Sequence, residues 1–301
     1  MAGKTIKLLG IQAGQGGKRL GAQDGPWMLR EFGLVQQLTD LGHQVEDLGD
    51  IPGIHATRYS VTGDASLNNL PVILQINRHT HACVLGTLRK DPNAFLLVVG
   101  GDHSLAIGTL AGLADSCKRL GILWLDAHAD FNDPGSSPSG NIHGMSLAVA
   151  CGIGNRDLRS IADRDPMLDE TDVYLLGVRD IDPGEQENLD EANVTALTVK
   201  GWRKASLVQT VLDAANSLRT RCDHIHLSFD IDVLDPADAP ATGTPVPGGL
   251  SADEARQVLK ALGENGLINS AEFVEYNPEL DADDRTGKLT MELLAAFFGG
   301  A

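Results

Sequence analysis

The chain has 301 residues, enough to bury a full-sized core and, by length alone, enough for two domains. Its 41 acidic and 24 basic residues give a formal net charge of −17, which argues against nucleic acid or an anionic membrane surface as a partner and is compatible with a cationic small ligand. Its four cysteines form no C-x-x-C pair, which argues against a disulfide framework or a zinc–thiolate site and favours reduced thiols in a cytoplasmic protein.

Short apolar runs alternate with amphipathic stretches, and none approaches the ~20 residues that cross a bilayer. The N-terminal residues 1–14 lack the basic start and apolar core of a signal peptide, and residues 5–11 within them predict a strand. Residues 25–42 predict a helix, with Pro26 in its first turn and Gly42 just past its end. Further strands are predicted at 95–99, 121–125, 172–178, 224–229 and 269–274, and further helices include 251–262 and 286–298. The alternation indicates an α/β fold, a single three-layer domain over 1–301 with a mostly parallel central sheet covered by helices on both faces.

Each of the five later strands ends directly on a polar cluster. In chain order the clusters read GGDHS, DAHAD, RDIDPGE, DIDVLDP and EYNP. Ligands of open α/β sheets bind at the carboxyl ends of the strands, because the parallel arrangement brings those ends to one edge. We therefore expect five clusters that are far apart in sequence to converge in space.

These clusters supply a set of candidate metal ligands. They are His103, Asp126, His128, Asp130, Asp230 and Asp232. In extended backbone, acids two residues apart share one face, and buried charges without a partner are costly. Four carboxylates and two imidazoles exceed what one catalytic zinc takes, and they suit two divalent ions, with oxygen-rich ligation favouring manganese. With a bridging hydroxide the cluster carries a charge near −1, which predicts hydrolysis of a cationic substrate, whose charge Glu275 can hold.

Simpler interpretations apply to other residues. A single Asp at a strand end is usually a turn former or helix cap, and we apply this to Asp102 and Asp235. Isolated histidines are interpreted as ordinary surface or core residues: His43, His55, His79, His81 and His224, with His226 placed in a packed strand. His143 either caps a helix beginning near Met145 or acts as a proton shuttle, and we favour the shuttle.

The motifs GGDHS, DAHAD, SFDIDVLDP and EYNP, in this order, resemble the ureohydrolase family of dinuclear manganese hydrolases, which includes arginases and agmatinases. The resemblance implies one Mn²⁺ held by His103, Asp126, Asp130 and Asp230. It implies a second Mn²⁺ held by Asp126, His128, Asp230 and Asp232. A hydroxide bridging the ions would attack the guanidinium carbon and give urea and an amine. In this resemblance Asp130 handles the hydroxide proton, His143 relays protons, Glu275 pairs with the guanidinium and Thr244 lines the site.

The loop DFNDPGSSPSGNIHG is similar to the arginase form, which places Asn132, Ser139 and Asn141 on the α-carboxylate of L-arginine. The segment RDIDPGE is similar in placing Asp182, and through water Glu185, on the α-amino group. The resemblance thus implies hydrolysis of L-arginine to L-ornithine and urea by a homo-oligomer, a trimer or a hexamer. One departure is Asp133, which adds a negative charge to this loop.

Two alternatives are a ureohydrolase for another guanidino compound, such as agmatine or guanidinobutyrate, and a catalytically silent metal-binding regulatory member of the family. The silent form is disfavoured, because all six ligand positions are present together with His143 and Glu275.

Overall fold

The computed structural model describes residues 3–53 and 66–299, so His55 lies outside the described residues. Within these ranges eight strands form one sheet in which every pairing is parallel, in the order β2-β1-β3-β8-β7-β4-β5-β6. The strands are β1 (Thr5–Ile11), β2 (Gln44–Ile51), β3 (Phe95–Gly100), β4 (Leu120–Leu125), β5 (Val173–Val178), β6 (Thr195–Thr198), β7 (His224–Asp230) and β8 (Ser270–Val274).

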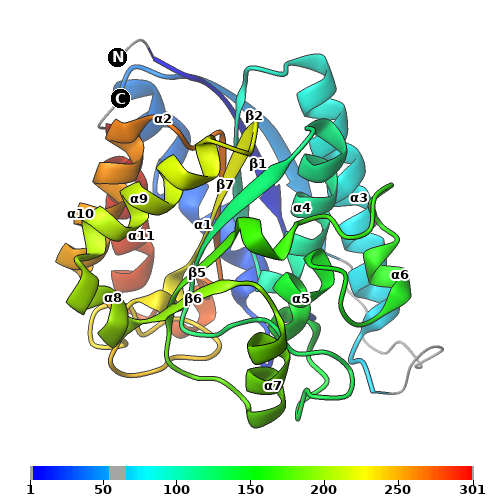
Figure 1. Cartoon of the computed structure of the whole chain (residues 1–301). Coiled ribbons are helices and arrows are strands. Elements are labelled where there is room, and N and C mark those ends of the chain that lie inside the picture. Colours follow the sequence, from blue (N-terminus) through cyan, green and yellow to red (C-terminus); the bar gives the residue numbers. More distant parts are fainter. Residues whose placement is uncertain (1–2, 54–65, 300–301) are drawn as a thin grey trace.

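Helices cover both faces of the sheet (Figure 1). One layer contains α3 (Leu70–Lys90), α4 (Ala106–Ser116), α5 (Ser146–Ala150) and α6 (Arg156–Arg159). The other contains α1 (Gly25–Glu31), α2 (Leu34–Asp40), α8 (Val199–Ala205), α9 (Leu207–Arg219), α10 (Ala252–Asn265) and α11 (Arg285–Gly299). A further helix, α7 (Pro183–Glu191), follows β5. None of the helices in the described part of the chain is long and apolar enough to span a membrane.

The central strands are buried on both faces, which explains their continuous apolar sequences. In β3, Leu96 and Val98 enter the core beneath α3 and α4, whereas Leu97 and Val99 enter the core on the α11 side. A strand between two helical layers has no solvent-facing side, so its sequence does not alternate. The predicted three-layer arrangement is confirmed.

The six predicted strands are present, but two strands and one helix boundary were missed. Both missed strands, β2 and β6, lie at the edges of the sheet and carry many exposed residues, so they lack the apolar run that identifies a buried strand. The single helix predicted over 25–42 is wrong. It is divided into α1 and α2 at Gly33, whose φ of 88° is incompatible with a right-handed helix.

The strand order places the five polar clusters side by side. The strands that precede them are β3, β8, β7, β4 and β5, and these are neighbours in the sheet. Because all of them run in the same direction, their carboxyl ends form one continuous edge. The fold therefore brings together residues from positions 100 to 278.

Two glycines in open surroundings should respond oppositely to the same substitution. An added Cβ would meet nothing within 4 Å at Gly33 or at Gly86, but Gly33 has φ 88° whereas Gly86 lies inside α3. We expect Gly33→Ala to lower the free energy of unfolding by about 1 kcal/mol through backbone strain. Gly86→Ala should raise it by about 0.5–1 kcal/mol through helix propensity. Urea unfolding of both variants measures this, and shifts of the same sign would contradict the backbone assignment.

Candidate metal centre and active site

Three carboxylates surround one nitrogen of His103 at the end of β3. His103 Nδ1 lies 3.1 Å from Asp126 Oδ2 and 3.2 Å from Asp130 Oδ2. It also lies 3.1 Å from Asp230 Oδ2. All four side chains are buried, and among the described residues neither His103 Nδ1 nor Asp130 Oδ2 has a hydrogen-bond partner. We call these four residues the first ligand group.

A second group shares Asp126 with the first. His128 Nδ1 lies 3.0 Å from Asp232 Oδ2 and 3.5 Å from Asp126 Oδ1. Asp126 therefore directs one carboxylate oxygen to each imidazole. Ligand atoms of His103, Asp126 and Asp230, and of Asp126, His128 and Asp232, lie close enough to hold an ion each. We call Asp126, His128 and Asp232 the second ligand group.

The local backbone that produces this convergence differs from the expected extended strand. β4 ends at Leu125, and the Asp126 carboxylate accepts a hydrogen bond from His128 N at 2.7 Å. Asp130 has φ 50°, in the left-handed region. The side chains at positions 126, 128 and 130 meet in one place, as predicted, but the extended backbone assumed for them is wrong, because the chain turns after the strand and the turn itself directs the side chains inward.

The Asp230 and Asp232 pair uses the same device. Asp230 is the last residue of β7, and Asp232 lies in a 3₁₀ turn over Ile231–Val233. Asp232 N donates to Asp230 Oδ1 at 2.8 Å. In both clusters a carboxylate at the strand end binds the amide two residues later with one oxygen, and its other oxygen takes part in the first ligand group.

The electrostatics of the first group favour a bound cation. Burial raises the pKa of Asp130 and Asp230 well above the usual range, and the charges of neighbouring carboxylates raise it further. The same crowding leaves buried polar atoms without partners, which is costly unless an ion fills the space between them. The donor set, carboxylate oxygens with one imidazole nitrogen in each group, fits divalent metal ions.

Glu275 connects His143 to the first group. Glu275 Oε1 accepts a hydrogen bond from His103 N at 2.9 Å and lies 3.0 Å from His143 Nδ1. The His143 side chain is 15% exposed, and Ser146 at the start of α5 bonds to its carbonyl rather than to its ring. Burial alone would lower the pKa of His143, but the hydrogen bond and charge of Glu275 outweigh it and raise that pKa to about 9.

A cavity of about 110 Å³ opens onto both groups. Five predicted substrate-binding residues line it: Asn132, Ser139, Asp182, Glu185 and Thr244. Thr244 Oγ1 also donates to Asp232 Oδ2 at 3.2 Å. The other two lie beside these, Glu275 against His143 and Asn141 in the loop of Ser139, where its Oδ1 accepts a bond from Asn68 Nδ2. The structure thus brings the predicted residues to one place.

The start of α7 braces the loop that forms the cavity wall. Asn132 Nδ2 donates to Asp182 Oδ2 at 3.1 Å, and Ser136 Oγ donates to Asn132 Oδ1 at 2.8 Å. The two oxygens of buried Glu185 accept from Phe131 N and Asp182 N. Burial raises the pKa of Glu185 to about 7, although these amide bonds oppose the shift. Asn132 and Asp182 are therefore held facing each other.

Sequence reasoning missed three residues of this region. Ser137 and Asp180 also line the cavity. The Arg179 guanidinium donates to the backbone carbonyls of Asp232 and Leu234, and so fixes the turn that carries the second group. Two of the three, Arg179 and Asp180, stand inside the RDIDPGE cluster, where their position directly after a buried strand was the available signal.

The prediction that Asp102 and Asp235 act as turn-capping residues is confirmed. The Asp235 carboxylate accepts from Ala237 N and Gly248 N. Asp102 accepts from Ser104 N and also from Gly16 N, which ties the segment after β1 to the site. Asp133 is turned away from the cavity and binds the amides of its own turn, at Gly135 and Ser136.

The other histidines lie in ordinary environments. His43 is buried and contacts the Phe298 carbonyl, His79 is exposed, and His81 pairs with Asp115. His226 is fully buried in β7, as expected, and both His224 and His226 contact Ser270.

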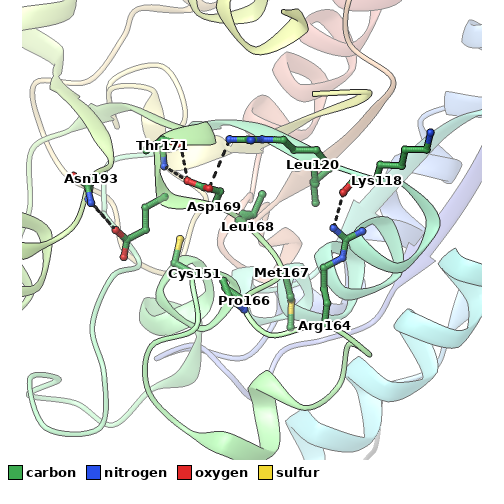
Figure 2. A pocket seen from close by; sticks show the side chains of 12 residues that line it. Lys118, Leu120, Cys151, Arg164, Pro166, Met167, Leu168, Asp169, Thr171 and Asn193 are labelled. Atoms are coloured by element: carbon green, nitrogen blue, oxygen red, sulfur yellow. Dashed lines mark hydrogen bonds and ion pairs between the residues drawn. The ribbon is translucent and has the colours of Figure 1, made fainter. Parts of the chain in front are cut away.

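A larger cavity of about 440 Å³ lies at the amino end of β4, on the opposite edge of the sheet (Figure 2). Its polar groups are engaged with one another. Arg164 donates to the Lys118 carbonyl, and Asp169 accepts from Thr171. Asn193 N donates to Glu170. Among the described residues that line this cavity, ligand atoms do not converge as they do in the first and second ligand groups.

Comparison with known proteins places this geometry in context. A sequence model described as the Arginase family matches residues 4–299. The arginases of Bacillus caldovelox and Bacillus subtilis strain 168 are each 40% identical over 296 residues, which is 98% of this chain and 98% of theirs. The solved B. caldovelox arginase has a TM-score of 0.93, with 98% of each chain covered. An Entamoeba histolytica arginase solved with L-ornithine has a TM-score of 0.89 at 31% identity, covering 99% of this chain and 100% of that one.

The two-group arrangement predicts unequal effects on two ions. Because His128 belongs to the second group alone, His128→Asn should weaken a divalent ion held by that group by at least about tenfold and leave an ion held by the first group nearly unchanged. Isothermal titration of the metal-free protein with Mn²⁺ measures both affinities. Retention of both ions at the original affinity would contradict the grouping.

The contact between Glu275 and His143 predicts a titration. In the metal-free protein the His143 ring should lose its proton near pH 9. In Glu275→Gln the hydrogen bond and charge of Glu275 disappear, while burial and the charges of Asp130 and Asp102 remain, so the pKa of His143 should fall below that of the parent chain. NMR titration of the histidine ring signals measures the shift, with His79, exposed on α3, as the internal control. An unchanged His143 pKa would show that Glu275 is not its main partner.

Proposed function

The chain belongs to the arginase family, and on that premise we propose that it hydrolyses the guanidinium group of L-arginine to give L-ornithine and urea. The observation that carries this proposal is the position of the two ligand groups, which share Asp126 and face a cavity. Hydrogen-bond donors that suit an α-carboxylate and acidic side chains that suit an α-ammonium group line that same cavity. One cavity thus offers both the ligand groups for a metal-activated hydrolysis and the side chains that would recognise an amino acid.

We propose two Mn²⁺ ions per chain as the cofactor. The first would be held by His103, Asp126, Asp130 and Asp230, and the second by Asp126, His128, Asp230 and Asp232. The fit is supported by buried ligand atoms without partners and by the predominance of carboxylate oxygens. When bound, the ions would supply an activated water to attack the guanidinium carbon.

The chain's own residues divide the remaining tasks. Asp130 would take the proton released by the attacking water, because its Oδ2 faces the group without another partner. His143 would carry protons between the site and solvent, since its ring is partly exposed at the cavity. Glu275 keeps His143 oriented with Oε1 and would pair with the guanidinium through Oε2, which lies near Gly243.

The cavity wall would recognise the amino acid end of the substrate. Asn132, Ser139 and Asn141 carry amide or hydroxyl donors for the α-carboxylate. Asp182 would bind the α-ammonium, and Glu185 would assist it through a water while bracing its backbone. Agmatine has no α-carboxylate, so this wall would give it no matching contact.

Removal of hydrogen-bond donors from the cavity wall should therefore affect the hydrolysis of L-arginine but not that of agmatine. Asn132→Ala and Ser139→Ala each delete a contact with the α-carboxylate, so KM for L-arginine should rise about 10-fold to 100-fold, corresponding to a hydrogen bond to a charged group. Any turnover of agmatine should change little. The measurement is urea release by Mn²⁺-loaded protein on L-arginine, agmatine and guanidinobutyrate, with exposed Ser160→Ala as the control.

Each result has a separate meaning. Preference of the parent protein for L-arginine by orders of magnitude supports both the ligand groups and the wall. Turnover of another guanidino compound alone would keep the ligand groups and overturn the assignment of Asn132, Ser139 and Asp182. Absence of urea from all three, with two ions bound, would favour a silent regulatory member of the family.

A further inference from the structure

A row of polar side chains is buried beneath His103, between β7 and β8. His103 Nε2 lies 2.8 Å from Ser228 Oγ, and Ser228 Oγ donates to Glu272 Oε1 at 2.8 Å. His226 Nε2 lies 3.5 Å from the same Glu272 oxygen, and His226 Nδ1 lies 2.8 Å from Ser270 Oγ. The last four of these residues have no exposed surface.

The sheet register places this row on adjacent strands. Ser228 pairs with Glu272, and His226 pairs with Ser270. Positions two apart on a strand share a face, so all four side chains point to one side of the sheet. Burying four polar groups among apolar strands is unfavourable unless each is hydrogen-bonded. Within this row only His103 belongs to a ligand group, and the row reaches it through Ser228.

The direction of each hydrogen bond follows from chemistry. An ionised carboxylate only accepts, so Ser228 must give its single proton to Glu272. Burial would raise the pKa of Glu272, but the neighbouring His226 outweighs it and keeps that pKa below its usual value. Having given its proton away, the Ser228 oxygen can only accept from His103, so the His103 proton must be on Nε2. In the neutral ring that binds a metal ion, Nδ1, which faces three carboxylates, is then the unprotonated nitrogen.

We propose that Glu272 is a positioning residue that acts through Ser228 to fix His103 in the Nε2-protonated form, so that Nδ1 is free to bind a metal ion. The proposal deepens the proposed metal centre and rests on it. Stacking of His103 on Trp124, with ring centroids 4.1 Å apart, holds the plane of the ring but does not choose which nitrogen carries the proton. Partners behind a ligating histidine are known to orient the ring and raise its basicity.

Within residues 3–53 and 66–299, no equivalent buried row lies behind His128. Its Nε2 lies 3.9 Å from Asp180, whose side chain is 67% exposed, and the His128 side chain itself is 23% exposed. Water can therefore accept or donate at that nitrogen. Loss of Glu272 should thus weaken the ion of the first ligand group and spare the ion of the second.

The test is Mn²⁺ binding by Glu272→Gln. The Gln amide has nearly the shape of the carboxylate but also carries a donor, so it can reverse the Ser228 bond and release the constraint on His103. We expect a 10-fold to 100-fold weaker first-group ion and an unchanged second ion. The same titration is repeated with Glu272→Gln introduced into the His128→Asn variant, where binding to the first ligand group dominates. A weaker affinity there shows that the lost binding belongs to the first ligand group.

Ser270→Ala is the matched control, because Ser270 is equally buried in β8 but lies beyond His226. Its Mn²⁺ affinities should stay within twofold of the parent chain. Unchanged binding in Glu272→Gln, or an equal loss in Ser270→Ala, would overturn the proposal and leave the proposed function intact. Failure of the parent chain to bind Mn²⁺ would overturn both. Should Glu272→Gln not fold, Ser228→Ala removes the coupling hydroxyl, and retention of the first-group ion in that variant would overturn the proposal.

Discussion

Mutual repulsion among buried carboxylates is the constraint on which the rest of the structure depends. Asp126, Asp130 and Asp230 approach one imidazole nitrogen within 3.2 Å in the interior of the protein. Such an arrangement is stable only if the surrounding backbone is rigid and the charge is reduced, either by protonation of the carboxylates or by a bound cation. The parallel sheet supplies the rigidity, because its five central neighbouring strands end at the same edge and are packed between two helical layers.

The carboxylates also organise the backbone that holds them. Asp126 and Asp230 each use one oxygen to bind the amide two residues later and the other to face the first group. Each side chain therefore stabilises the turn that positions the next ligand, His128 or Asp232. A ligand position and its local fold are inseparable here, and substitution of either acid by an apolar residue would remove both.

The hydrophobic pattern of the sequence was sufficient to predict the layers and the central strands. The position of each polar cluster directly after a strand was sufficient to predict that the clusters converge, because the ends of parallel strands lie at one edge of the sheet. The turn geometry was not predictable in this way. The left-handed φ of Asp130 and the 3₁₀ turn at Asp232 depend on hydrogen bonds between residues that a strand pattern does not reveal. Glu272 was hidden for a related reason: inside the predicted strand NSAEFV it is one acid among apolar neighbours, and only the register with Ser228 shows its partner.

Two separate hydrogen-bond networks support the two halves of the cavity. The ligand groups rest on strand ends and on the buried row of β7 and β8, whereas the recognition loop rests on the start of α7 through Asp182 and Glu185. Because the loop is braced by side chains that make no contact with the ligand atoms, its residues can change without disturbing the metal centre. Substrate preference can therefore diverge among proteins of this fold while the hydrolytic chemistry stays the same, since a new loop sequence needs to satisfy α7, Asn68 and the substrate rather than the ligand atoms.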